Sequence, residues 1–171
     1  MFSAHSRSAA LPRTSVGRWL RAALMRQPAL REQLRPTLNG GKPGWNDDEP
    51  AVVEAACELA VRRYFTQEYD VRAVADFVAE LRLAAGNEPP LDQLRTEAVI
   101  RSALGEGDVV TDDITAGQQF HMRVAVIALL TFRLRLDEAA IDKLINDSER
   151  IAFERGWHPA LVARNSRAHR S

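Results

Sequence analysis

Hydrophobic residues recur along this chain with the three- and four-residue spacing of amphipathic helices. The longest uninterrupted apolar run covers residues 124–130 and lies between Arg123 and Arg133. A run of this length fits either a strand or a helix. The capping-box pattern from Thr115 to Gln118, and the absence of Gly and Pro from residues 118 to 155, favour a helix. Because this helix is apolar on every face, we expect it to be the central buried helix of the fold.

The same periodicity, read together with capping residues and Gly or Pro breaks, predicts the other helices. One helix from residue 115 to residue 155 would be about 60 Å long, which is too long for a small compact domain. We therefore place a break at residues 136–137, where Asp137 is a suitable cap for a new helix. The helices expected in the body span residues 50–65, 70–85, 89–104, 115–136 and 137–155. The predicted fold class is all-α, a compact bundle of about five helices preceded by a basic N-terminal amphipathic arm.

Charge is distributed unevenly over a chain whose formal net charge is zero. Residues 1–42 carry eight basic residues and one acidic residue, whereas residues 43–154 carry eleven basic and twenty-two acidic ones. A stretch rich in Gly and Pro, residues 39–50, separates the two parts. We predict a basic, partly disordered arm and linker at residues 1–42, an acidic helical domain at residues 43–158 and a basic C-terminal tail at residues 159–171.

The arm contains an expected amphipathic helix from about Ser15, with Trp19 on its apolar face and Arg18, Arg21 and Arg26 elsewhere. Its composition fits several interpretations, which stay open at this point. They are an organelle transit peptide, a segment that binds nucleic acid or anionic membrane, a segment that folds back on the acidic body, and an extension upstream of a true start at Met25.

Compartment and membrane association are constrained by two features. Cys57 is the only cysteine, so an intramolecular disulfide is excluded and a reducing, cytoplasmic location is expected, with the thiol buried in a helix. The apolar run of seven residues is far shorter than the roughly 20 that a membrane span requires. We therefore expect no transmembrane segment.

Catalytic and metal-binding motifs are absent from the sequence. The acidic loop from Glu106 to Asp113 lacks the spacing of a calcium loop, and His121 has no partner that the sequence identifies. Glu149 and Glu154 are expected on a solvent-exposed helix face. We predict no cofactor, no metal site and no catalytic residue, and we favour a protein that is not an enzyme.

The features that remain favour a protein-interaction or adaptor module built on an acidic helical bundle, with another protein as its partner. The expected binding surface is an acidic helix face or a groove lined by Tyr64, Phe65 and Tyr69. The alternative is a regulator that binds nucleic acid or anionic membrane through the basic arm, by way of Arg18, Trp19, Arg21 and Arg26. Oligomerisation is compatible with either function.

Overall fold

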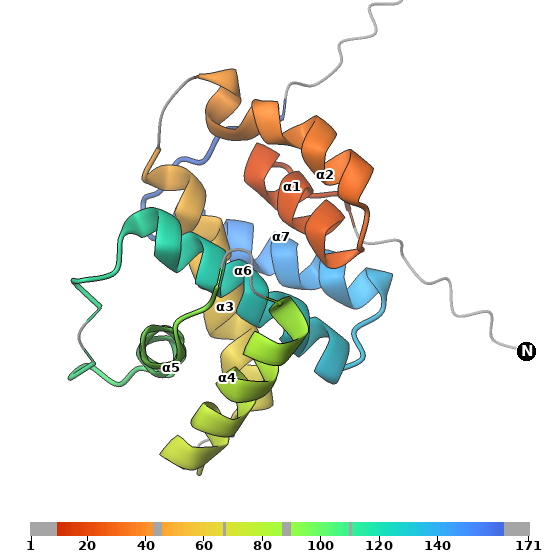
Figure 1. Ribbon diagram of the computed structural model, residues 1–171. Coiled ribbons are helices and arrows are strands. Elements are labelled where there is room, and N and C mark those ends of the chain that lie inside the picture. The colour runs from red at the N-terminus through yellow and green to blue at the C-terminus, as the bar shows by residue number, and fades with distance from the viewer. Residues whose placement is uncertain (1–9, 43–45, 67, 87–89, 110, 163–171) are drawn as a thin grey trace, which may run out of the picture.

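The computed structural model describes residues 10–42, 46–66, 68–86, 90–109 and 111–162. In this part of the chain it contains seven α-helices and one 3₁₀ helix. Figure 1 shows α1 and α2 on one side of the molecule and α4 and α5 on the opposite side, with α3, α6 and α7 between them. The elements are α1 (Ser15–Leu24), α2 (Pro28–Leu34), η1 (Arg35–Gly41), α3 (Asp48–Tyr64), α4 (Val71–Ala85), α5 (Gln93–Ala103), α6 (Ala116–Arg133) and α7 (Glu138–Glu154).

The all-α class is confirmed, but the expected number of about five helices is too low. The five helices predicted for the body correspond to α3 to α7, and the two others, α1 and α2, come from the segment that we expected to be an arm. The capping box that begins α6 is present, with Thr115 and Gln118 bonded reciprocally. The predicted break after α6 is also present, because Asp137 Oδ1 accepts a hydrogen bond of 2.8 Å from Ala140 N and caps α7.

The central helix of the bundle is α3 rather than α6, which corrects the expectation from the apolar run. The apolar side chains that it buries are small, so neighbouring helices can approach it closely from several directions. α6 and α7 make the most extensive contacts with it. The buried apolar residues of α3 are Ala51, Val52, Val53, Ala55, Ala56, Cys57, Ala60 and Val61.

Within the segment expected to be a partly disordered arm, α1 is part of the hydrophobic core, whereas α2 and η1 contain no buried residue. Val16 and Leu20 are fully buried and Leu24 is 8% exposed, and α1 packs against α3, α6 and α7. Burial of each such side chain contributes about 1.5–3 kcal/mol to folding. Charge as well as apolar burial holds α1 against the body, because Arg21 forms ion pairs with Glu138 and Asp142 of α7. Among the interpretations left open, α1 follows the one in which the arm folds back on the acidic body.

A buried carboxylate anchors the start of α1. Glu149 of α7 was expected to face solvent, yet it is fully buried. Its carboxylate accepts hydrogen bonds from Thr14 N (2.8 Å), Thr14 Oγ1 (2.7 Å) and Arg13 N (3.0 Å). The charge is therefore satisfied by the backbone and hydroxyl of a segment 135 residues away in the sequence. Gly17 allows this close approach, since a Cβ at that position would overlap Glu149 Oε1.

The C-terminal part of the described chain also contacts the start of α1. Thr14 and Leu161 form an isolated antiparallel bridge, in which Val162 N donates to Arg13 O and Ser15 N donates to Ala160 O, both at 2.8 Å. Ala10 also contacts the body, because its carbonyl oxygen accepts a hydrogen bond from Asn146 Nδ2. Residues 1–9, residues 43–45 of the linker and the tail beyond residue 162 lie outside the described residues, and so does any disorder predicted for them. The division into an arm, a domain and a tail stays a prediction.

No helix in the described ranges combines the length and the apolar character needed to cross a membrane.

Candidate functional site

An uncovered apolar surface lies along the C-terminal half of α6. This half begins at Ala125, and on one side Val126, Ile127 and Leu130 are fully buried. On the other side Ala128 is exposed, Leu129 is only partly buried and Phe132 is 63% exposed. The sequence pattern of a helix that is apolar on every face is therefore real, but the fold of this chain covers only part of that surface.

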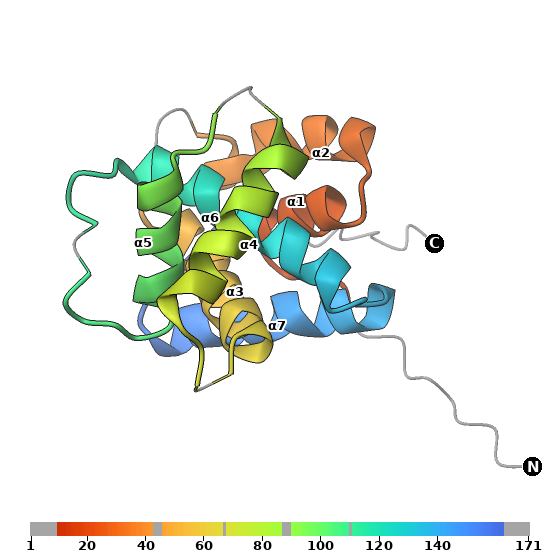
Figure 2. The same ribbon diagram turned by 60° about the horizontal axis from the view of Figure 1, so that its bottom comes forward.

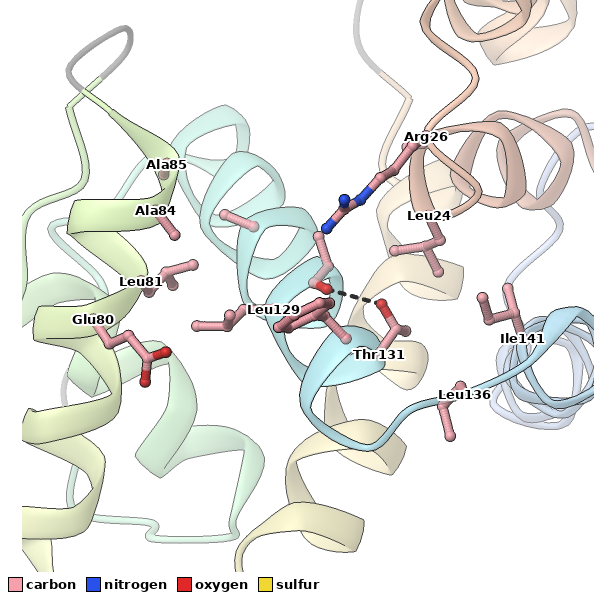
Figure 3. Close-up of a pocket in the computed structure, with 14 residues that line it drawn as sticks. Leu24, Arg26, Glu80, Leu81, Ala84, Ala85, Leu129, Thr131, Leu136 and Ile141 are labelled. Atoms are coloured by element: carbon pink, nitrogen blue, oxygen red, sulfur yellow. Dashed lines mark hydrogen bonds between the residues drawn. The ribbon is translucent and has the colours of Figure 1, made fainter.

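Two walls turn this surface into a groove, which we call the α6 groove. α4 forms one wall, and the end of α1 together with the start of α7 forms the other, as Figure 3 shows. Figure 2 shows α4 lying across α6 from a second direction. The groove has a cavity volume of about 520 Å³, within the ~300–1,000 Å³ range of ligand pockets. It is lined by Ala23, Leu24, Arg26, Glu80, Leu81, Ala84, Ala85, Ala125, Ala128, Leu129, Thr131, Phe132, Leu136 and Ile141.

The floor of the α6 groove is apolar and its polar groups are already satisfied. Thr131 Oγ1 donates a 2.8 Å hydrogen bond to Ala128 O, which Figure 3 draws as a dashed line. The charged groups lie at the rim. Arg133 forms an ion pair with Glu80, and this contact raises the pKa of the Arg133 guanidinium. Arg26 extends its guanidinium over the ring of Phe132, 5.6 Å from the ring centroid.

Arg26 has an unusual backbone conformation for an arginine. It follows the end of α1 with φ = 53°, and the bonds Arg26 N to Ala23 O and Gln27 N to Ala22 O complete a Schellman motif around it. Glycine is the usual residue at this position because a Cβ strains the left-handed conformation. Arg135 occupies the equivalent position after α6, with φ = 51°. At the end of α7 the same position is taken by Gly156.

The four residues predicted to act in the arm are placed on or next to α1. Arg18 Nε donates to Pro12 O at 3.0 Å, and the ring of Trp19 lies 5.5 Å from that of Phe120. Arg21 forms the ion pairs with α7 described above. Of the four, Arg26 alone lines the α6 groove.

The three aromatic residues predicted to line a groove pack on one another instead. Tyr64 and Phe65 meet edge to face at 5.0 Å, Phe65 lies 6.2 Å from Tyr69, and Phe77 completes the cluster. Phe65 is buried and Tyr64 is 36% exposed. None of these three residues lines the α6 groove.

The acidic loop and His121 do not converge on one site. Glu106 accepts hydrogen bonds from Arg101 and Tyr69, which lower the pKa of its carboxyl, and Asp113 pairs with Arg95. His121 is exposed and borders a separate cavity of about 450 Å³. Within the described ranges no group of three or more His, Cys, Asp or Glu side chains is arranged to hold a metal ion.

The sequence analysis did not predict that Leu129 and Phe132 form an exposed surface together with Ala84 and Ala85 of α4. The signal was present in the apolar run, which supplies more apolar faces than one small bundle covers.

Comparison of this chain with protein-family models, with characterised proteins and with solved structures finds no match.

Proposed function

We propose that this protein is a non-enzymatic interaction module that binds a helical segment of another protein in the α6 groove. The observation that carries the proposal is the exposed apolar floor, where Phe132 is 63% exposed beside Leu129 and Ala128. Exposed apolar surface bounded by polar groups is typical of interaction sites. The groove offers a binding surface and no titratable group on its floor, which supports binding rather than chemistry.

Binding of nucleic acid or anionic membrane through α1 has weaker support. Arg18 and Arg21 donate to acceptors within this chain, and the face of α1 that carries Val16 and Leu20 is buried in the core. An amphipathic helix binds a membrane through its apolar face, which here is occupied.

The experiment is site-specific photo-crosslinking in the organism that naturally makes the protein. A benzoylphenylalanine residue replaces Phe132 in one variant and Trp157 in the other. Trp157 is a matched control, because it is also an exposed aromatic residue, at 40%, and does not line the groove. We expect one defined protein adduct from position 132 and not from position 157. Adducts that are equal at both positions, or absent from both, would refute the proposal.

A further inference from the structure

The shape of the α6 groove restricts the kind of segment that fits it. Its floor runs from Ala125 to Phe132, which is about 10 Å of helix at ~1.5 Å per residue. This length matches two turns of a bound helix, whose anchors recur at positions i, i+3 or i+4, and i+7. Alanines occupy both the floor and the α4 wall, so a helix backbone can approach to the 8–10 Å typical of helix packing.

A small polar ligand is a poor match for the same surface. Binding pockets for such ligands place a few polar groups where they fix the orientation of the ligand. Here the one hydroxyl on the floor, that of Thr131, is already bonded to the backbone of α6. The charged side chains stand at the rim, where they meet the flanks of an occupant rather than its apolar stripe.

The rim charges define the complementary partner. Glu80 is paired with Arg133, whereas Arg26 has no ion pair with any residue that the structure describes. Among the described residues that line the groove, Arg26 is therefore a cation without an ion pair, and the one carboxylate, that of Glu80, is already paired. Arg26 also holds a backbone conformation that glycine adopts with less strain, so folding alone does not favour an arginine there.

We infer that the α6 groove binds an acidic amphipathic helix of a partner protein, with its apolar stripe on Leu129 and Phe132 and a flanking carboxylate paired with Arg26. This inference rests on the proposed function and specifies the chemistry of the partner. Opposite charges at an interface select the partner and its orientation more than they add affinity. A helix with the same apolar stripe and basic flanks would place its cations against Arg26 and bind less tightly.

The test uses two fluorescein-labelled helical peptides that share one leucine pattern, i, i+4, i+7, and differ in having glutamate or lysine on the flanks. Fluorescence anisotropy measures the affinity of each for the full chain. We expect the glutamate peptide to bind about ten-fold more tightly, and Arg26→Glu to reverse that preference.

Arg26→Gly should lower the affinity for the glutamate peptide about three- to five-fold, as expected for one exposed ion pair. The matched control Arg135→Gly makes the same substitution in the same helix-end geometry outside the groove lining, and should leave the affinity unchanged.

A groove-filling variant, Ala128→Trp, separates this inference from the proposed function. Ala128 is exposed, so the larger side chain occupies the groove without entering the core. Equal binding of both peptides, abolished by Ala128→Trp, would overturn the acidic partner and leave the groove function standing. Binding that survives Ala128→Trp would overturn both. Failure of both peptides to bind would overturn the inference, and the adduct at position 132 would still decide the function. A dimer in sedimentation that Ala128→Trp dissociates would assign the groove to a second copy of this chain and also overturn the inference.

Discussion

Gly17 gives the sharpest test of how the N-terminal segment is held. In an ordinary helix interior, Gly→Ala stabilises a protein by about 1 kcal/mol. Here the added Cβ would overlap Glu149 Oε1 and lie 2.8 Å from Thr14 Oγ1, so the buried carboxylate has to move. Oε1 accepts two hydrogen bonds, each worth about 1.5–3 kcal/mol because the acceptor is charged. The loss of both hydrogen bonds, less the gain of about 1 kcal/mol in helix propensity, gives a net destabilisation of about 2–5 kcal/mol.

Gly117→Ala is the matched control for this substitution. Gly117 lies in the first turn of α6, and a Cβ there meets no atom within 4 Å. We expect Gly117→Ala to raise the free energy of unfolding by up to about 1 kcal/mol. In thermal unfolding followed by circular dichroism, Gly17→Ala should lower Tm by about 4–20 °C, at ~2–4 °C per kcal/mol for a chain of this size. A Gly17→Ala protein as stable as the Gly117→Ala protein would show that Glu149 does not anchor the segment.

Three further predictions concern other residues. Glu49 Oε1 accepts hydrogen bonds from Asn39 N and Ala160 N, and burial of the side chain raises the pKa of its carboxyl. Folding therefore favours the protonated form of Glu49. The resulting stability is present below the ordinary glutamate pKa and is lost as pH rises through the folded pKa. Glu49→Gln should therefore gain in Tm relative to the native protein as pH rises above the ordinary glutamate pKa, and a pH-independent difference would contradict this. Burial raises the pKa of the Cys57 thiol to about 12, so iodoacetamide should alkylate it only at the rate of unfolding, as measured by mass spectrometry across a urea series. Arg135→Gly should stabilise the chain by about 1 kcal/mol in urea unfolding, since it relieves a left-handed Arg; a loss of stability would mean that its side chain contributes contacts.

The parts of the fold that sequence reasoning predicted are those encoded by neighbouring residues. The capping box of α6 and the Asp137 cap of α7 involve side chains three residues from their backbone partners. Gly86 and Gly156 end α4 and α7 for a similarly local reason, because each adopts a positive φ. These signals fix where helices begin and end, and they are independent of how the helices pack.

The parts that it missed depend on residues far apart in the chain. Glu149 lies between polar neighbours and has the pattern of a solvent-exposed helix face. It is buried because Arg13 and Thr14 supply hydrogen bonds from the opposite end of the sequence, which no periodicity reports. The central position of α3 was missed for a related reason, because alanine gives a weak hydrophobic signal even where it allows the closest packing.

Part of the uneven charge of the chain is paired internally. Arg21 of the basic segment pairs with two carboxylates of α7, and Arg155 near the basic C-terminal end pairs with Glu58 of α3. Segment charge alone therefore does not identify an outside partner for α1. Arg26 at the end of α1 is more informative, because its guanidinium lies over the exposed ring of Phe132 and not against a carboxylate. The segment that completes the core thus also places a cation at the rim of the α6 groove, and our inference is that this cation would distinguish an acidic helix from a basic one.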